Sequence, residues 1–243
     1  METDCSDGNR LQDLIRNDKM AEKGEFIELE YTGRLKDEGM VFDTTSEKTA
    51  KEEGIWDKNM KYGPAIVCLG EGQLLSGLDQ KLVGKSVGKH TIELAPEEGF
   101  GKKDAKLLRI VPTNIFRQQK IDPVPGLQVN IDGAMGTIRT VTGGRTVVDF
   151  NHPLSGKEVV YDIDLKRVVK DDKEKVKAFV SLALGLKDLD VDIKDSVAVI
   201  STGKEIPQEI AEKLQEEIAR LTDIKKITFT KNNTEKEAEK KEK

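Results

Sequence analysis

An α+β fold is predicted by three features of the sequence. From residue 25 to residue 94, short segments alternate apolar and polar residues, which is typical of half-buried strands in an antiparallel sheet. Residues 105–150 consist of strand-like runs separated by prolines and glycines. After residue 170, helical apolar stripes alternate with short strands. We therefore expect an α+β main domain with half-buried strands and a short helix, an inserted small β-rich domain and a C-terminal α/β module.

The composition argues against several classes of function. The chain has 243 residues, 36% of them apolar, and its 45 acidic and 40 basic side chains leave a net charge of −5. A protein that binds nucleic acid through the phosphates needs a concentrated basic face, which this charge balance does not favour. No apolar run reaches membrane-spanning length, and residues 1–19 are polar, so we expect neither a membrane protein nor a signal peptide.

Cysteine and histidine are too few for a disulfide framework or a metal site. The cysteines are Cys5 and Cys68, and the histidines, His90 and His152, lie far apart in the sequence. Cys68 falls in an apolar strand and is predicted to be an inert core thiol, while His152 is expected to order a turn. We therefore expect no metal, no cofactor and a reducing, cytoplasmic location.

The first predicted strand follows an extension without periodicity. Residues 1–23 are expected to be disordered, with Met20 a second plausible start. Ile27, Leu29 and Tyr31 then alternate with glutamates, which predicts a half-buried strand. The glycine at the following Thr32-Gly33 pair is expected to end that strand.

A second strand, a helix and a long loop come next. Residues 41–43 predict a strand in which apolar side chains precede the acid Asp43. Residues 46–54 have helical content, and Gly54 is placed where a C-terminal cap is expected. Residues 56–64 form a long irregular segment, and loops of this length are more often functional than idle.

The middle of the domain is expected to be a strand, a glycine-rich turn and a short helix. Residues 67–69 predict the strand, and the helix is expected to present Leu74, Leu75 and Leu78. Leu74 and Leu78 are four residues apart and would therefore share a helical face. Residues 90–94 predict a further alternating strand.

The β-rich segment is predicted to interrupt the first sheet. Its four strand-like runs are residues 107–111, 127–131, 136–141 and 146–150. Residues 159–165 then read as a strand that rejoins the earlier sheet, which makes residues 105–150 an insertion. The predicted main domain therefore comprises residues 24–104 and 151–169.

The C-terminal module, residues 170–230, is predicted as helix, strand, helix and strand. The helices are expected at 173–184 and after Pro207, and the strands at 196–200 and 226–230. The apolar helix faces of such a small unit need a cover, either from a second copy of the chain or from the main domain. Residues 231–243 are a charged tail expected to be disordered.

Five separated motifs resemble those of one enzyme family and occur in its order. They are Tyr31-Thr32-Gly33, Val41-Phe42-Asp43-Thr44, Leu69-Gly70-Glu71-Gly72-Gln73-Leu74-Leu75-Ser76-Gly77, Gly99-Phe100-Gly101 and Asn151-His152-Pro153-Leu154-Ser155-Gly156. Across residues 24–169 the chain resembles FKBP-type peptidyl-prolyl cis/trans isomerases, especially the SlyD-like and long archaeal members that carry a chaperone domain in the flap. Without that resemblance, Asp43 would be read as a structural acid and the aromatic residues as core.

The resemblance implies an apolar pocket with one carboxylate at its edge. In the family this pocket is formed by an antiparallel sheet wrapped on a short helix. The implied catalytic residues are Tyr31, Phe42, Asp43, Leu75, Phe100 and Tyr161, and the implied substrate-binding residues of the pocket are Leu74 and Leu78. In the insert, Ile115, Phe116 and Leu127 are predicted to bind substrate, and with Ile131, Ile138 and Val148 they are candidates for its core or for an exposed apolar groove. The backbone N–H of Leu75 would hold the substrate carbonyl beyond the proline. The family usually has tyrosine where Phe100 stands, so the resemblance does not extend to that hydroxyl's hydrogen bond. Tryptophan is common in the family where Leu78 stands.

The implied reaction needs no covalent chemistry. Rotation about a peptide bond has a barrier of roughly 18–20 kcal/mol because resonance gives the bond double-bond character. A dry pocket disfavours the charge-separated resonance form and so favours the twisted amide. Each tenfold gain in rate requires about 1.4 kcal/mol, so a few such contributions suffice.

Three functions fit the sequence. The first is an isomerase that accelerates X-Pro isomerisation in unfolded or partly folded polypeptides, with holdase activity from the insert. The second is a non-catalytic chaperone with a decayed pocket, an alternative that Phe100 supports. The third is a scaffold in which the C-terminal module forms a homodimer. None of the three involves nucleic acid or a membrane.

Overall fold

The computed structural model describes residues 20–186 and 189–231, which form two compact units. The first unit comprises the described residues up to Ile92 and from Val160 onward, and the second is the stretch Glu93–Val159 between them. The expected mixture of antiparallel sheets with few helices is confirmed. Within the described ranges, no helix is long and apolar enough to cross a membrane.

The predicted N-terminal extension is partly wrong. Residues 1–19 lie outside the described residues, but Ala21 is fully buried. Its N–H donates to the carbonyl of Lys85 at 2.8 Å, and its own carbonyl accepts from the N–H of Gly84 at 2.8 Å. Residues 20–23 therefore belong to the folded unit, because pairing with the turn after α3 (Ser76–Leu82) holds them in place.

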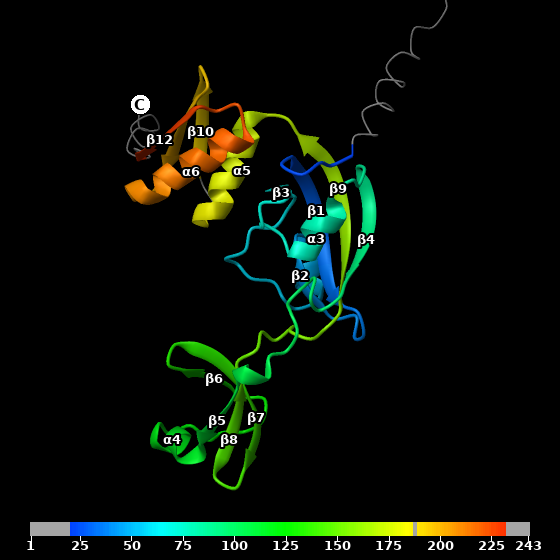
Figure 1. The fold of residues 1–243 in the computed structure, drawn as a ribbon, viewed down its shortest axis with the longest axis vertical. Helices are drawn as coiled ribbons and strands as arrows, with labels where there is room; N and C mark the ends of the chain where they lie inside the picture. Colours follow the sequence, from blue (N-terminus) through cyan, green and yellow to red (C-terminus); the bar gives the residue numbers. More distant parts are fainter. Residues whose placement is uncertain (1–19, 187–188, 232–243) are drawn as a thin grey trace, which may run out of the picture. The chain divides into compact units, whose positions relative to one another are not determined.

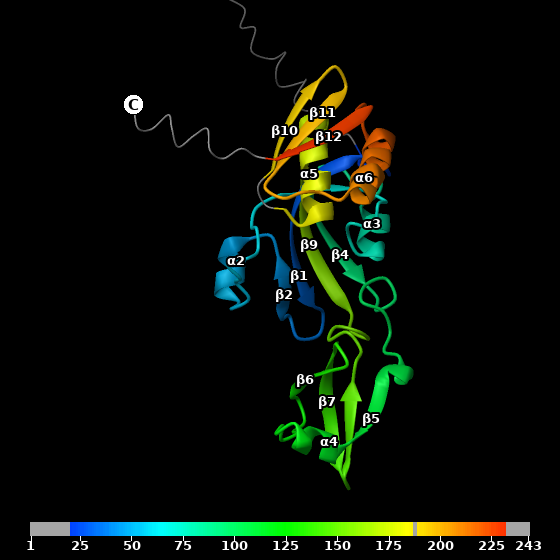
Figure 2. The same ribbon diagram turned by 90° about the vertical axis from the view of Figure 1, so that its left-hand side faces the viewer.

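A five-stranded sheet forms the body of the first unit (Figures 1 and 2). Its strands are β1 (Phe26–Leu35), β2 (Val41–Thr44), β3 (Ala65–Cys68), β4 (Gly88–Leu94) and β9 (Val159–Val169). The order is β2-β1-β9-β4, with β3 paired to β1. Helix α3 lies across one face and buries Leu78 and Leu82, and α2 (Glu47–Glu52) follows β2. The predicted return of the chain to this sheet is confirmed by β9.

Two predicted boundaries in this unit are wrong. Strand β1 continues through Gly33 to Leu35, with a shift of register between Gly33 and Arg34. Helix α3 begins at Ser76, so Leu74 and Leu75 precede it and do not share a helical face with Leu78. In both places the boundary depends on tertiary contacts of a glycine-containing motif. The local spacing of apolar residues does not reveal such contacts.

The C-terminal module consists of two helices and a three-stranded sheet. The helices are α5 (Asp172–Leu184) and α6 (Gln208–Leu221), and the strands are β10 (Leu189–Lys194), β11 (Val197–Thr202) and β12 (Lys226–Lys231). Strand β11 pairs antiparallel with β10 and parallel with β12. Strand β10 was not predicted, although its apolar residues alternate with acids in the pattern of a strand.

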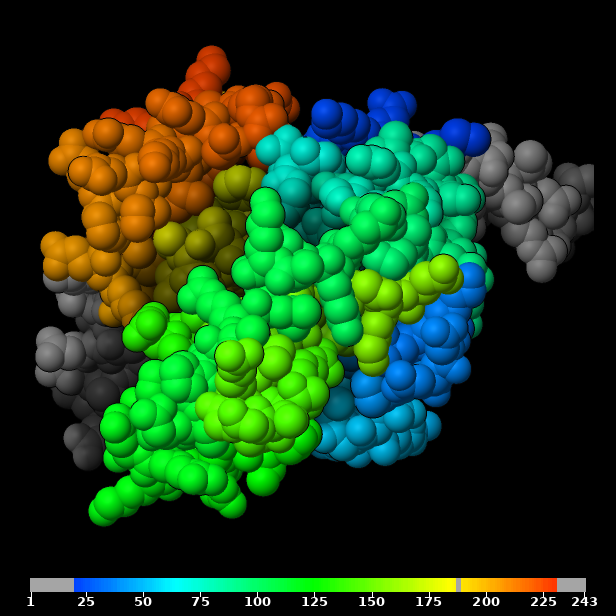
Figure 3. Space-filling view, turned by 60° about the horizontal axis from the view of Figure 1, so that its bottom comes forward, coloured from blue at the N-terminus to red at the C-terminus, as the bar shows by residue number. Residues whose placement is uncertain are grey.

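This module packs on the main sheet of the same unit. Phe26 of β1 and Cys68 of β3 belong to one buried cluster with Phe179, Leu214 and Ile218 of the module's helices. The rings of Phe26 and Phe179 lie edge to face, with centroids 6.4 Å apart. The surfaces of the module (orange) and of the residues around β3 (cyan) meet in Figure 3. The apolar helix faces were expected to be covered by a second copy of the chain or by the main domain. In the described residues, the main domain covers them.

The second unit is a four-stranded antiparallel sheet with one short helix. Its strands are β5 (Leu108–Pro112), β6 (Gln128–Ile131), β7 (Ala134–Thr142) and β8 (Arg145–Asp149), in the order β5-β8-β7-β6. A 3-10 turn, η1 (Ala105–Leu107), precedes β5. The sequence analysis missed helix α4 (Thr113–Gln118), which has only six residues. The core consists of Phe116, Val129, Ile138 and Val148.

Candidate active site

Three strands of the first unit bring an aromatic cluster and one carboxylate together. Gly33 of β1 pairs with Asp43 of β2, so Tyr31, two residues before Gly33, lies diagonally across from Asp43 on the same face. The Tyr31 hydroxyl donates a hydrogen bond to Oδ2 of Asp43 at 3.0 Å. The ring of Tyr161 on β9 lies 5.8 Å from that of Tyr31, and also 5.8 Å from that of Phe42, which it meets edge to face.

Gly33 allows these rings to approach the strand. A Cβ atom at this position would lie 2.8 Å from Cε1 of Tyr161 and 3.0 Å from Cζ of Phe42. Real Cβ atoms do not approach other atoms this closely without displacing them. Gly33 was predicted only as a strand end, but a glycine inside a strand often marks such a close approach.

Both tyrosines keep their protons at neutral pH. Burial, followed by the negative charge of Asp43, raises the pKa of Tyr31, and the hydrogen bond that it donates to this carboxylate adds to the effect. Burial and the Asp43 charge likewise raise the pKa of Tyr161. Tyr31 therefore acts as a donor that orients Asp43. The cluster offers a half-buried aromatic environment with one oriented carboxylate rather than a proton-transfer pair.

Two buried threonines fasten the chain immediately after Asp43. Thr44 donates its hydroxyl to the carbonyl of Tyr31 at 3.1 Å. The N–H of Tyr31 donates to the hydroxyl of Thr45 at 2.9 Å, and the N–H of Thr45 donates to the Tyr31 carbonyl at 3.0 Å. These bonds fix β2 against β1 at Asp43. The sequence analysis assigned the two threonines no role.

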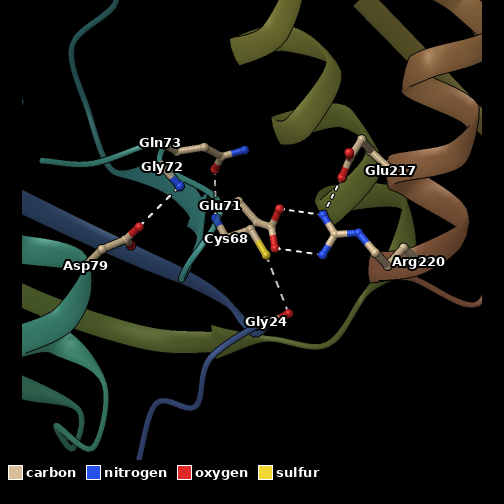
Figure 4. Close-up of polar contacts among 8 residues, drawn as sticks. All are labelled: Gly24, Cys68, Glu71, Gly72, Gln73, Asp79, Glu217 and Arg220. Carbon is tan, nitrogen blue, oxygen red and sulfur yellow. Dashed lines mark hydrogen bonds and ion pairs between the residues drawn. The ribbon is translucent and has the colours of Figure 1, made fainter. Parts of the chain in front are cut away.

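The turn between β3 and α3 leads to Leu74 and Leu75, which are expected to face the substrate, and Figure 4 shows its polar contacts. Gly70 and Gly72 adopt positive φ angles of 85° and 66°, which glycine accepts without strain. The Cys68 N–H donates to Oε1 of Gln73 at 2.8 Å, and the Gly72 N–H donates to Oδ2 of Asp79 at 3.2 Å. Two hydrogen bonds, one at Cys68 and one at Gly72, therefore anchor the turn.

Leu75 is the N-cap residue of α3. Its carbonyl accepts from the Asp79 N–H at 3.0 Å, which begins the helix. Leu74 and Leu75 are half-buried, and Leu78 is buried. Burial raises the pKa of the Cys68 thiol to about 12, which confirms the prediction of an inert core thiol.

Phe100 belongs to the second unit, where it stacks on a histidine. Its ring lies 4.8 Å from that of His152, and the two planes are parallel within 1°. The Ser155 hydroxyl donates to the Phe100 carbonyl at 3.0 Å, which joins the two motifs expected in this part of the chain. The Leu154 N–H donates to Nδ1 of His152 at 3.2 Å, so the prediction that His152 orders its turn is confirmed.

The substrate-binding residues predicted in the insert differ in their exposure. Phe116 is 3% exposed and lies in the core of the second unit, so of the two places predicted for it, core or groove, the structure shows the core. The reason is that α4 turns this ring inward. Leu127 packs half-buried against the same core, whereas Ile115 is 41% exposed.

The long irregular segment after α2 lines a cavity. Residues 60–66 enclose a volume of about 400 Å³ together with Tyr31 and one side of α5. Met60 and Leu182 are exposed at its rim. This segment therefore lines a cavity that Tyr31 and α5 also line.

Comparison with known proteins identifies the family. The family model described as "FKBP26, IF domain" matches residues 109–154. The chain is 31% identical over 156 residues to a short-type peptidyl-prolyl cis-trans isomerase of Methanocaldococcus jannaschii, covering 64% of this chain and 98% of that relative. The chain belongs to the FKBP-type peptidyl-prolyl cis-trans isomerase family.

Two bacterial relatives of this isomerase match shorter stretches. It is 34% identical over 110 residues to an FKBP-type 16 kDa isomerase of Escherichia coli, which covers 43% of the chain and 74% of the relative. It is 29% identical over 126 residues to the isomerase SlyD of Vibrio cholerae, covering 49% of the chain and 62% of the relative. The expectation of a peptidyl-prolyl cis-trans isomerase is therefore confirmed.

Proposed function

We propose that this isomerase rotates X-Pro bonds of unfolded polypeptides at the cluster of Tyr31, Phe42, Asp43 and Tyr161. The observation that carries this proposal is the Tyr31–Asp43 hydrogen bond beside two rings closed over Gly33. It combines an apolar wall that can hold a proline ring with one oriented carboxylate. No nucleophile is needed, because isomerisation breaks no covalent bond.

The barrier falls through the environment of the amide. An apolar pocket disfavours the charge-separated resonance form that gives the C–N bond its double-bond character. The free energy of the twisted amide is therefore lowered relative to that of the planar amide. We assign the backbone N–H of Leu75 to the substrate carbonyl beyond the proline. Leu74 and Leu78 are assigned to the wall around the proline.

The cis-to-trans rate of a short Xaa-Pro peptide tests this site. We expect Phe42→Ala and Asp43→Ala each to lower kcat/KM by about tenfold or more, corresponding to about 1.4 kcal/mol or more of barrier. Asp37→Ala, an exposed acid between β1 and β2, is the matched control and should retain the wild-type value. Wild-type rates in both site variants would rule out this location for the active site.

We further propose that the second unit holds unfolded chains. Leu108 and Ile110 on β5 are 45% and 65% exposed. They pair with Asp149 and Val147, on the face of the sheet opposite the core residue Val148. Since β5 is an end strand in the order of this sheet, its free edge and these two side chains together suit an extended apolar peptide.

A client without proline separates holding from isomerisation. We expect the wild type to suppress aggregation of such a client, and Leu108→Ser with Ile110→Ser to lose most of this effect while peptide isomerisation remains. Ile115→Ser, on α4, is the control for loss of an exposed apolar side chain elsewhere in the unit. Equal suppression by all variants, and by a chain lacking residues 105–150, would exclude the second unit as the holdase.

No scaffold function is proposed. The helix faces that a second copy would cover already pack on Phe26 and Cys68 of the main sheet.

A further inference from the structure

An ion pair links the C-terminal module to the turn that precedes Leu75 (Figure 4). Arg220 on α6 donates from Nη1 to Oε1 of Glu71 at 2.9 Å and from Nη2 to Oε2 at 2.5 Å. Glu217, one turn earlier on α6, accepts a further hydrogen bond from Nη2. The side chain of Glu71 is only 17% exposed, whereas that of Arg220 is 53% exposed. The hydrogen bonds from Arg220 hold the pKa of Glu71 below its usual range.

Arg220 reaches the turn from a rigid base. Ile218, two residues earlier on α6, is 1% exposed and lies in the cluster that joins the module to Phe26 and Cys68. The helix is therefore fixed to the main sheet by its apolar face. A guanidinium that grips both carboxylate oxygens also fixes the direction of the Glu71 side chain, which a single contact would not do.

The glycine-rich sequence of the turn between β3 and α3 does not by itself fix its backbone conformation. Gly70 and Gly72 flank Glu71 in positive-φ conformations, and glycines leave the chain many alternative conformations. Its inner side is anchored by Gln73 and Asp79. The carboxylate of Glu71 in this turn is held by Arg220. The side chain of Lys23 lies close to the turn as well, since a Cβ at Gly70 would be 2.7 Å from Lys23 Cγ.

We propose that Arg220 is a positioning residue for the isomerase site. By fixing Glu71, it holds the backbone from Gly72 to Leu75 in the orientation in which the Leu75 N–H meets the substrate. This rests on the proposed function, which assigns that N–H to the substrate carbonyl. A donor that is already in place costs no reorganisation during the reaction, so its position affects the rate. The C-terminal module is then part of the isomerase site's support.

The consequence is a coupling between two residues that are 149 positions apart in sequence. Loss of either partner should release the turn in the same way. Arg220→Ala and Glu71→Gln should therefore each lower kcat/KM on a short Xaa-Pro peptide, and the double variant should be no slower than either single one. Arg220→Lys should give an intermediate rate, because an ammonium cannot grip both oxygens.

The experiment compares these variants in the full chain. We expect a decrease in kcat/KM of about 3- to 10-fold for Arg220→Ala, since misplacement of a catalytic group by about 1 Å can cost up to about 100-fold. Backbone amide signals of Gly72 to Leu75 should shift in the NMR spectrum, while that of Gly33 should not. Lys213→Ala removes another exposed cation from α6 and should leave both readouts unchanged.

Three outcomes would overturn the proposal. They are wild-type kcat/KM in Arg220→Ala, a decrease without shifts at Gly72 to Leu75, and additive losses in the double variant. Phe42→Ala distinguishes failure of the positioning role from failure of the proposed site. If Phe42→Ala is slow and Arg220→Ala is not, only the positioning role fails. If Phe42→Ala is also unaffected, the proposed site itself is wrong.

Discussion

Gly33 and Tyr161 lie in contact across neighbouring strands, so closely that a Cβ on Gly33 would be 2.8 Å from Cε1 of the ring. This contact brings the ring of Tyr161 within 5.8 Å of both Tyr31 and Phe42. The shape of the aromatic wall therefore depends on the absence of a side chain at one position. The same contact explains why a glycine stands in the middle of β1.

Gly33→Ala should damage both the fold and the reaction. The added methyl group must displace Tyr161 or Phe42, and overpacking of this kind typically costs about 1–3 kcal/mol of unfolding free energy. We also expect kcat/KM to fall at least about tenfold, because the displaced rings line the proposed pocket. Urea unfolding and peptide isomerisation measure the two effects. Gly203→Ala, where an added Cβ meets open space, is the control and should be neutral in both assays.

Tyr31→Phe should weaken the site while leaving its packing in place. The substitution removes the hydroxyl that donates to Asp43 at 3.0 Å and leaves the carboxylate free to rotate. Hydrogen bonds to charged groups contribute about 1.5–3 kcal/mol, so we expect a loss of stability within or below that range. Isomerisation should slow about 3- to 10-fold, equivalent to about 0.7–1.4 kcal/mol of barrier. Tyr62→Phe, outside the aromatic cluster, should retain the wild-type rate, and an equal loss there would contradict the role of Tyr31.

Much of the fold follows from local patterns, whereas the site depends on contacts distant in sequence. Strands such as β1, β7 and β8 were predictable because alternation is a local signal. The continuation of β1 past Gly33 was not predictable, because it is explained by the contact of Gly33 with the Tyr161 ring on β9. Helix α4 is too short for a helical periodicity to be recognised in the sequence, and it buries Phe116.

The same distinction applies to the candidate site. The motifs around Asp43 and Leu75 were visible in the sequence because each is contiguous. Arg220 carries no local signal, since its partner Glu71 lies 149 residues away. Such a pair emerges only once the module packs on the main sheet.

Alkaline pH should destabilise the protein partly through Tyr31. Its pKa is raised in the folded state by burial and by Asp43, above the ordinary value of 10.0. The protonated form is therefore favoured by folding, and the associated stability is complete below pH 10.0 and is lost as the pH rises toward the folded value. Urea midpoints measured upward from neutral pH should fall above that point. The fall should be shallower in Tyr31→Phe, and an identical slope in the variant would contradict the assignment.

Phe179→Ala should unfold the module and the main sheet together. Phe179 is buried against Phe26, and its cluster contains side chains from both the module and the main sheet. Removal of a buried phenylalanine typically costs about 3–5 kcal/mol. We expect one cooperative transition for the first unit, shifted to lower temperature, with fluorescence of Trp56 in the main domain and helical circular dichroism changing at the same midpoint. Leu182→Ala on the same helix is the control, because that side chain is 52% exposed and should cost little. Separate transitions would show that the module folds independently, and Arg220 would then lack the rigid base from which it holds Glu71.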